Sequence, residues 1–470
     1  MGNGRTKYLA KNTLLCTISS FGSKLISFFL VPLYTNVLTK AEYGTADLIS
    51  TTVSLLLFVF SINISSGILR YAIDSDEYHG SYLKYGLNIF VLGFCLLCIC
   101  LIPVTNTGII GLDNSHYSYI ILLYFFLGLS ELLSNYFRAR DKVWLITVAG
   151  ISTTLVTVVG NIVLLLVVQM GFTGYMLSLI MGQAVSCVIF IAFGHPRILH
   201  QPKLSSLQKK EIVLYSLPLI FNGVAWWVNQ SLDKYFITNM LTVDDNGIYA
   251  VAGKLPTILS TCLAIFIQAW NLSAIKEYDS DDSAEFYTNA YRVLRFCLCL
   301  CASVLIIVSV PVAKILFAKE FFIAWKYSLL LLLAGVFSGM SSFLGSVFSA
   351  AKKSNIFAYS TVAAAVVNIG LNFVLIPRYG IQGATMATAV SFFVIWIIRY
   401  ICVQRIRRMK VGVIVEIVLY VLLVAQIILQ QTDSHFYLIQ VAIIVAILGL
   451  SWKEVLGVVK IAKSLLKKKN

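Results

Sequence analysis

The chain has 470 residues, of which 59% are hydrophobic and 12% charged, and its formal net charge is +15. Soluble domains usually carry about 25% charged residues, so this composition excludes an ordinary soluble globular protein. The net positive charge does not indicate nucleic-acid binding, because the basic residues stand in short segments between long apolar runs, where Lys and Arg set the orientation of membrane helices.

Continuous apolar runs of helix length follow one another along the whole chain. About 20 apolar residues are needed for a helix that crosses the hydrocarbon core of a bilayer. A transmembrane β-barrel would instead alternate apolar and polar residues over segments of about ten. The sequence therefore predicts an all-α integral membrane protein with about 14 transmembrane helices. Their predicted residue ranges are 12–36, 47–69, 83–104, 117–137, 144–168, 172–193, 212–240, 247–270, 288–312, 325–350, 355–376, 380–403, 411–430 and 436–452.

The distribution of Lys and Arg predicts which side of the membrane each segment faces. If the N-terminus is cytoplasmic, 27 of the 36 Lys and Arg fall in inside segments and 5 in outside segments. One helix too many or too few would scramble this alternation, so the bias favours both the count and the orientation. We expect a multi-pass protein of the bacterial inner (plasma) membrane with both termini cytoplasmic, and a first helix that is retained and not removed as a signal peptide.

The second half of the chain repeats features of the first. The motif Thr35-Asn36-Val37-Leu38-Thr39, followed by Gly44, recurs as Thr238-Asn239-Met240-Leu241-Thr242, followed by Gly247. A second echo pairs Asn161, Gly171 and Gly174 with Asn368, Gly380 and Gly383. Each half contains six predicted helices, and an even number keeps both halves in the same orientation, as in parallel repeats. The predicted organisation is an N-terminal six-helix lobe (1–194), a cytoplasmic linker (195–210), a C-terminal six-helix lobe (211–403), and two additional transmembrane helices with a basic cytoplasmic tail (404–470).

The sequence carries no convincing enzyme signature. All five histidines fall in predicted loops, so we expect no intramembrane His relay and no zinc site. The segment from Gly247 to Lys254 superficially resembles a phosphate-binding loop, but its spacing is one residue too long and Leu255 stands where Ser or Thr is required. We expect no catalytic residue, no metal and no cofactor.

Basic residues inside or at the ends of the predicted helices are the candidate substrate-binding residues. Lys24 lies midway along the first predicted helix, Lys234 late in the seventh and Lys254 early in the eighth, while Arg70 ends the second. A charge at the bilayer centre costs about 2.5–3.5 kcal/mol on insertion scales, so such residues usually face a cavity or a partner. A cationic cavity between two lobes would suit an anionic ligand such as a diphosphate. The alternatives are snorkelling to the interface for each Lys, membrane anchoring for Arg70, and pairing with an acid on a neighbouring helix for Lys234.

Two acidic residues inside predicted helices are candidates for ion coupling or for helix pairing. Glu131 lies in the fourth predicted helix, where it could bind a proton or a cation, or form a polar contact between helices. Asp233 precedes Lys234, and the step of about 100° per residue prevents the two side chains from facing the same direction. Trp226 and Trp227 could stack on sugar rings, but we expect packing or membrane anchoring.

Two segments carry a resemblance to a known protein family. The first runs from Phe21-Gly22-Ser23-Lys24 through Pro32-Leu33-Tyr34 to Glu42-Tyr43-Gly44, and the second from Ser216-Leu217-Pro218 through Asp233-Lys234 to Gly247-Ile248-Tyr249. Together they resemble the openings of the two lobes in bacterial polysaccharide flippases of the multidrug/oligosaccharidyl-lipid/polysaccharide exporter superfamily. The resemblance extends over the first twelve predicted helices. It implies a V-shaped, two-lobe fold with alternating access, in which Lys24, Lys254 and Asp233 match charged positions of the cavity.

The resemblance also implies a function. Flippases of this kind move undecaprenyl-diphosphate-linked oligosaccharide, the repeat unit of O-antigen (lipopolysaccharide), capsule or a related surface polysaccharide, from the cytoplasmic to the periplasmic leaflet. The expected partners are this lipid-linked oligosaccharide, membrane lipids and a polysaccharide polymerase, with no nucleic acid. One alternative is an ion-coupled small-molecule or multidrug exporter of the same superfamily, which would favour an acidic cavity. Another is a membrane glycan polymerase or ligase, which usually needs a large periplasmic loop.

Overall fold

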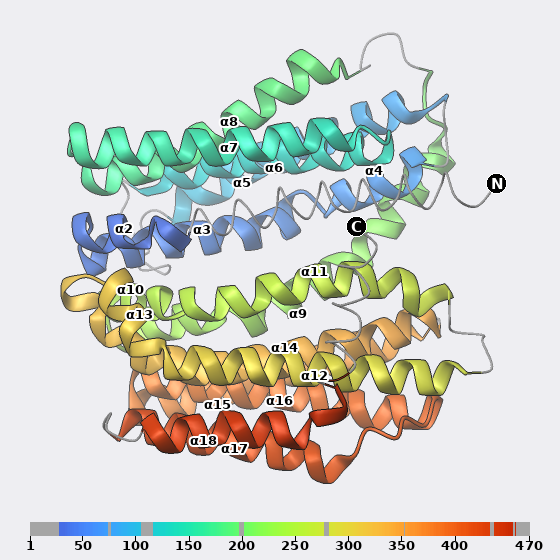
Figure 1. Cartoon of the computed structure of the whole chain (residues 1–470). Helices are drawn as coiled ribbons and strands as arrows, with labels where there is room; N and C mark the ends of the chain where they lie inside the picture. Colours follow the sequence, from blue (N-terminus) through green and yellow to red (C-terminus); the bar gives the residue numbers. More distant parts are fainter. Residues whose placement is uncertain are drawn as a thin grey trace, which may run out of the picture. The chain divides into compact units, whose positions relative to one another are not determined.

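A computed structural model describes residues 28–73, 77–104, 116–196, 202–276, 282–351, 353–432, 437–454 and 456. These residues form helices joined by short turns, and none of them lies in a β-strand (Figure 1). Eleven helices among them are long and apolar enough to cross a membrane, or twelve if Val243–Ala252 and Lys254–Ala264, which are bent by 42°, form one span. The predicted all-α membrane fold is confirmed, and the predicted fourteenth helix is the short apolar helix Tyr437–Leu450. The predicted first helix lies mostly outside the described residues.

Contacts divide the chain into two compact units, 1–250 and 251–470. In the first unit, α6 packs against α3, α4, α5 and α8, while α9 packs against both α3 and α4. Figure 1 shows α3, α6 and α7 of this unit running alongside one another. The predicted lobe boundaries at 194 and 211 stay a prediction. The helices of the first unit are α2 (Val31–Val37), α3 (Lys40–Phe60), α4 (Ile64–Ile73), α5 (His79–Val104), α6 (Tyr117–Ala139), α7 (Val143–Asn161) with a π-helical turn (Ile162–Val167), α8 (Gly171–Gly194), α9 (Ser206–Met240) and most of α10 (Val243–Ala252).

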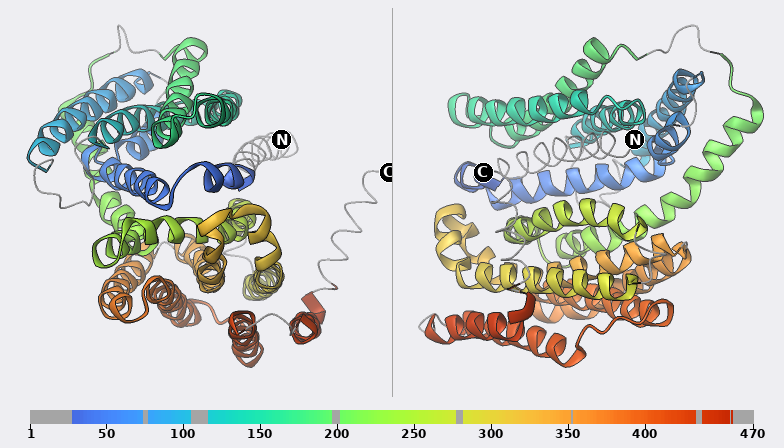
Figure 2. Two further views of the ribbon diagram at one scale, coloured as in Figure 1. Left: turned by 90° about the vertical axis from the view of Figure 1, so that its left-hand side faces the viewer. Right: turned by 45° about the vertical axis from the view of Figure 1, so that its right-hand side comes forward.

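In the second unit, α14 is the central helix, in contact with α11, α12 and α16, and α15 lies beside α16 (Figure 2). The carboxylate of Glu416 on α17 is fully buried against α12, where it accepts hydrogen bonds from Tyr291 (2.5 Å) and Tyr420 (3.0 Å). The helices of this unit are α11 (Lys254–Lys276), α12 (Ser283–Ile307), α13 (Ser309–Leu316), a 3₁₀ turn (Lys319–Ile323), α14 (Ala324–Ala350), α15 (Ser354–Tyr379), α16 (Ile381–Ile406), α17 (Val413–Gln431) and α18 (Tyr437–Leu450).

The two copies of the Thr-Asn-x-Leu-Thr motif end a helix in the same way. The Thr and Asn side chains near the C-terminus of α2, and those near the C-terminus of α9, each donate to the carbonyl four residues earlier. Such bonds turn short polar side chains back onto the backbone of their own helix. The bonds are Thr35 to Val31 (3.1 Å), Asn36 to Pro32 (2.8 Å), Thr238 to Lys234 (2.8 Å) and Asn239 to Tyr235 (2.9 Å).

The last residue of each motif begins the next helix in the same way. The hydroxyl of Thr39 accepts from the Glu42 amide (3.2 Å), and the hydroxyl of Thr242 accepts from the Asp245 amide (3.1 Å). In each copy the hydroxyl also donates to the acidic side chain, at 3.0 and 2.7 Å. An N-cap of this type satisfies amides that have no partner within the helix. The motif is therefore a helix–turn–helix signal that occurs twice.

The second sequence echo shares two features of its glycines between the copies. Gly171 at the start of α8 and Gly380 directly before α16 have φ angles of +54° and +58°, which L side chains rarely adopt. Gly174 and Gly383, three residues later, each bring their Cα against a carbonyl of the preceding helix. The first echo thus corresponds to matching local folds, and the second to matching glycine positions, as a duplicated unit would produce.

Candidate functional site

The four basic candidates occupy different parts of the chain. Lys24 lies outside the described residues. Arg70 is exposed in the last turn of α4, whereas Lys234 is half-buried near the end of α9 and contacts the beginning of α3. These two residues therefore lie at opposite ends of the α3–α4 segment and do not form one site. Lys254 is half-buried at the first position of α11 in the second unit.

Lys234 forms an ion pair with Asp47 across the contact between α9 and α3. Its Nζ lies 2.9 Å from Asp47 Oδ2 and 3.0 Å from both Asp47 Oδ1 and the hydroxyl of Thr51. Both charged side chains keep some access to solvent, at 18% for Lys234 and 21% for Asp47. The pair stands about 10 Å from the ends of the two helices, since each residue of an α-helix rises 1.5 Å. The pairing of Lys234 with an acid, one of the two possibilities open from the sequence, is present.

A ladder of hydrogen bonds continues from this pair along the two helices. The indole of Trp227 donates to the Thr51 carbonyl and to the Ser54 hydroxyl, both at 3.1 Å, and the hydroxyls of Tyr235 and Thr52 lie 2.5 Å apart. We define the α3–α9 seam as Asp47, Thr51, Thr52 and Ser54 on α3 with Trp227, Lys234 and Tyr235 on α9. Trp227 is only 7% exposed, so its ring packs in the seam and is not available for stacking on a sugar.

Two glycines close one end of the seam. A Cβ on Gly44 would lie 2.9 Å from the amide nitrogen of Gly247 and nearer still to the carbonyl oxygen of Val243. A Cβ on Gly247 would collide with the carbonyl of Lys40, and Asn246 donates to the Gly44 carbonyl at 2.9 Å. Lys40 and Val243 occupy the same position in the two copies of the motif, so the contact is reciprocal. Only glycine at both positions allows the backbones to approach so closely.

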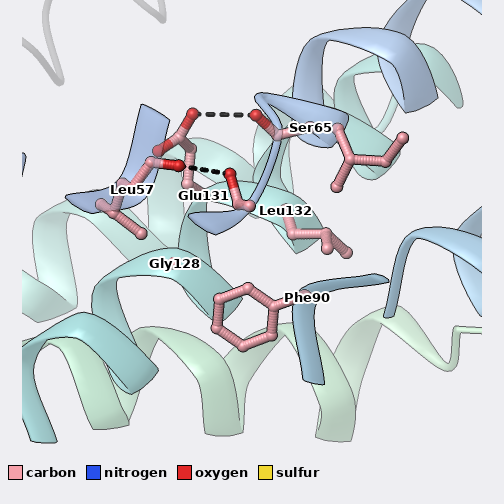
Figure 3. A pocket seen from close by; sticks show the side chains of 8 residues that line it. Leu57, Ser65, Phe90, Gly128, Glu131 and Leu132 are labelled. Atoms are coloured by element: carbon pink, nitrogen blue, oxygen red, sulfur yellow. Dashed lines mark hydrogen bonds between the residues drawn. The ribbon is translucent and has the colours of Figure 1, made fainter. Parts of the chain in front are cut away.

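The two acidic candidates lie in separate surroundings. Asp233 is fully buried and its carboxylate accepts a hydrogen bond from the Tyr249 hydroxyl at 2.8 Å, on a different side of α9 from the Lys234–Asp47 pair. Glu131 on α6 accepts a hydrogen bond from Ser65 on α4 at 2.9 Å. Figure 3 shows these two side chains pointing toward one another above Leu57 and Phe90. Both side chains line a small pocket whose other walls include Leu57, Phe90 and Leu132.

Arg399 on α16 shows what a structural cation looks like in this protein. It is fully buried, and its guanidinium donates to Ser360 (2.9 Å), to the Ser341 carbonyl (2.9 Å) and to Thr361 (3.0 Å), over the ring of Phe357. Burial and neutral acceptors on several sides leave no room for a ligand. Lys234, in contrast, is partly accessible and is held by one carboxylate and one hydroxyl.

Asp47 and Thr51 are residues that sequence reasoning missed. Asp47 was the first residue of a predicted helix, where a charge is unremarkable, and its partner lies 187 residues further along the chain. The available signal was the spacing of Asp47, Thr51 and Ser54, since positions i, i+4 and i+7 share one face of a helix. A polar stripe on a membrane helix indicates a face that meets protein or water and not acyl chains.

The comparisons with known proteins agree with this fold. A family model described as "Polysaccharide biosynthesis protein" matches residues 9–271. The chain is 23% identical over 277 residues to the Lsg locus putative protein 1 of Haemophilus influenzae, covering 56% of this chain and 64% of that protein. It is 26% identical over 225 residues to the probable low-salt glycan biosynthesis flippase Agl15 of Haloferax volcanii, covering 46% of this chain and 47% of that protein. The matches thus span about half to two thirds of these relatives.

Solved structures extend the similarity over nearly the whole chain. The lipid II flippase MurJ in an inward closed conformation superposes with a TM-score of 0.68, covering 93% of this chain and 98% of that one, at 14% sequence identity. At this identity the superposition establishes a shared fold. The chain is therefore a multi-pass membrane protein with the helical architecture of that transporter.

Proposed function

Because the chain belongs to the polysaccharide biosynthesis protein family, we propose that it is a flippase for lipid-linked oligosaccharide. The proposed substrate is undecaprenyl-diphosphate-linked oligosaccharide, a repeat unit of O-antigen, capsule or a related surface polysaccharide. The lobes 1–194 and 211–403 would expose the substrate site alternately to the cytoplasmic and the periplasmic side. The reaction is transport without a catalytic residue. The name of the Haloferax relative, a glycan biosynthesis flippase, supports this proposal.

The loop charges supply the orientation. With both termini cytoplasmic in a bacterial inner membrane, the turn between α2 and α3 faces the periplasm, and so does the Gly44–Gly247 contact. The α3–α9 seam then lies in the periplasmic half of the membrane. Release of the glycan to the outside would require α9, which belongs to the second proposed lobe, to part from α3.

The observation that carries the proposal is the partly accessible ion pair between Lys234 and Asp47. Hydrogen bonds between ammonium and phosphate are charge-assisted and about twice as strong as neutral ones. A diphosphate that reached the seam could replace Asp47 as the partner of Lys234, because it offers more negative charge and more acceptor oxygens. The exchange would break one of the bonds that hold α9 against α3. Binding of the substrate headgroup would thereby favour separation of the seam, with Lys24, Lys254 and Arg70 as additional contacts of the headgroup along the route.

Reconstitution tests the proposal directly. The purified chain would be placed in liposomes that contain a fluorescent undecaprenyl-diphosphate oligosaccharide. The fraction of the fluorescence that a membrane-impermeant quencher removes would then be measured over time. We expect the chain to equilibrate the label between leaflets, and Lys234→Ala to slow this equilibration more than Lys234→Arg. Equal rates in protein-free and protein-containing liposomes would contradict the proposal.

The alternative functions predict different results in the same material. A multidrug exporter would move cationic dyes across the liposome membrane and would leave the labelled glycan lipid in place. A polymerase or ligase would change the mass of the glycan. An association with a polysaccharide polymerase is a further part of the proposal, and co-purification of the two proteins from detergent extracts would test it.

A further inference from the structure

The α3–α4 segment is broken directly after the candidate membrane span Lys40–Phe60. α3 ends at Phe60 and α4 begins at Ile64, and between them Ile62 and Asn63 have φ angles of +54° and +48°. The left-handed conformation costs L residues roughly 1–2 kcal/mol each, and for a β-branched residue such as Ile it is a true outlier. Strained conformations of this kind persist where the surroundings impose them, and they cluster at functional sites.

The Glu131 pocket lies against this break. It is lined by Ser61 from the break itself, Ser65 from the first turn of α4 and Glu131 from α6, and its remaining walls are apolar (Figure 3). The Ser61 hydroxyl donates to the Leu57 carbonyl at 2.5 Å, and the Ser65 hydroxyl donates to Glu131. The pocket therefore gathers a carboxylate and two hydroxyl oxygens beside the C-terminal end of a broken helix, an arrangement that transporters use to hold Na⁺ or a proton.

Glu131 is exposed although it lies well inside a membrane span. It stands eight residues before the end of α6, which is about 12 Å from that end. A charge that faced acyl chains in the bilayer interior would cost about 2.5–3.5 kcal/mol, so carboxylates at this depth usually face the helix bundle or a water-filled cavity. Such a cavity would give a cation a route to the pocket.

No Lys or Arg neutralises Glu131 at ion-pair distance among the described residues. Its nearest charged neighbour on the same helix is Arg138, two turns away. The helices α7 and α8, packed around α6, carry no charged residue within their bounds. The charged residues and histidines on the other helices against α6 are Arg70 on α4, His79 and Lys84 on α5, and Lys40, Glu42 and Asp47 on α3. The tyrosines and cysteines on the helices packed against α6 are Tyr43, Tyr71, Tyr82, Tyr85, Cys95, Cys98, Cys100, Tyr175 and Cys187.

We propose that Glu131 is the binding site of the cation that drives transport, a proton or Na⁺. This inference rests on the proposed flippase function and adds the ion to which it is coupled. Both ions share one chemistry here, which is neutralisation of the carboxylate by a single positive charge. The ion would be bound by Glu131 with Ser65 and Ser61, and the Ser65 hydroxyl would turn from donor to acceptor when Glu131 is protonated. Because Glu131 and Ser65 join α6 to α4, the loaded and empty states differ in this helix contact.

Infrared difference spectroscopy on the chain in glycan-free liposomes tests the site by itself. A step in pH at constant Na⁺, and a step in Na⁺ at constant pH with choline as the replacement, would each be recorded for wild type and Glu131→Gln. We expect a carboxyl difference band in wild type that is absent in Glu131→Gln. A response to pH alone identifies the proton, and a response to Na⁺ at constant pH identifies Na⁺. An unchanged band in Glu131→Gln overturns the proposal.

Two further measurements test the role of Ser65 and distinguish a failure of the cation site from a failure of the flippase function. Ser65→Ala should keep the band but move its frequency, because the carboxyl group loses a hydrogen-bond partner. A band at the wild-type frequency contradicts the proposed role of Ser65. In liposomes with an imposed ion gradient, Glu131→Gln should lose the acceleration of glycan-lipid movement that the gradient gives to wild type. If wild type does not move the glycan lipid while the band is present, the flippase function fails and the cation site stands.

Discussion

Gly44 and Gly247 press their backbones together at equivalent positions of two copies of one sequence motif. Each glycine approaches the carbonyl of the residue that begins the other's helix, Val243 in one direction and Lys40 in the other. A reciprocal contact of this kind is what two repeats related by an axis along the membrane normal would form where they meet. In the proposed transport cycle, closure on the periplasmic side therefore requires that both positions lack a Cβ.

A larger side chain at either glycine should therefore hold the seam apart. Gly44→Leu or Gly247→Leu places a side chain against backbone that cannot move aside. Overpacking of this type costs about 1–3 kcal/mol, which lowers the population of the closed seam about 5- to 150-fold. The measurement is the rate at which a maleimide labels Ser54→Cys in the seam, in a variant from which all other cysteines have been removed. We expect this rate to rise.

The matched control for this experiment is Gly370→Leu. A Cβ at Gly370 meets nothing within 4 Å, so the substitution adds bulk to a transmembrane helix without a collision. The labelling rate should stay at the wild-type value. If all three leucine variants label alike, the glycine contact does not control access to the seam.

Exchanging the charges of the ion pair should separate stability from transport. Lys234→Ala leaves Asp47 without its partner in a partly buried site, which should lower the free energy of unfolding by about 1–3 kcal/mol. The double variant Lys234→Asp with Asp47→Lys restores a pair and should recover most of this loss. It should not restore flipping, because the cation would stand on α3 and not on α9. Thermal unfolding and the liposome assay measure the two effects, and wild-type flipping by the exchanged pair would contradict the role of Lys234.

The Trp227 indole should matter for stability and not for the glycan. Trp227→Phe removes the donor to Thr51 and Ser54 but keeps an aromatic ring in the seam. Loss of a typical hydrogen bond costs about 0.5–1.5 kcal/mol, so we expect a modest fall in the unfolding midpoint. The apparent Kd for the lipid-linked oligosaccharide should not change. A large rise in that Kd with unchanged stability would instead indicate that Trp227 stacks on sugar.

Glu416 should be required for docking of the two C-terminal helices. Its carboxylate accepts hydrogen bonds from two tyrosine hydroxyls and lies 3.9 Å from the guanidinium of Arg295 in a buried site. Glu416→Ala therefore leaves the buried Arg295 without its acidic partner. Breaking a buried pair costs about 3–5 kcal/mol. We expect a large fall in thermal stability, which fluorescence-detected size-exclusion chromatography after heating would measure. Ile414→Ala, at a side chain 80% exposed on the same helix, is the control and should be nearly neutral.

Much of the fold could be predicted from the sequence, because length and apolarity of a run are local properties. The predicted helix 117–137 corresponds to α6 at Tyr117–Ala139. The predicted helix 212–240 began too late, since α9 starts at Ser206 behind a capping box of Ser205 and Gln208 that lies before the apolar run. The break at residues 61–63 was not predicted, because Ile62 is not a residue that usually adopts a left-handed conformation.

The site could be predicted only in part. Lys234 and Glu131 stood out because charges are rare inside membrane spans, and this rule needs no knowledge of neighbours. The partner of each residue is a long-range property. Asp47 reaches Lys234, and Ser65 reaches Glu131, only after distant segments of the chain have packed together. The reciprocal glycine contact likewise needs coordinates, although the repetition of the motif around Gly44 and Gly247 is visible in the sequence.

The most direct test of flipping uses the protein in its host. The gene would be deleted, and an impermeant label specific for the glycan would be applied to spheroplasts of the deletion strain carrying a plasmid with wild type, Lys234→Ala or no insert. We expect labelled oligosaccharide outside with wild type, accumulation of unlabelled lipid-linked oligosaccharide without insert, and little rescue by Lys234→Ala at equal protein level. Normal labelling outside in the strain without insert would contradict the proposed flippase function, because the glycan would then cross the membrane without this protein.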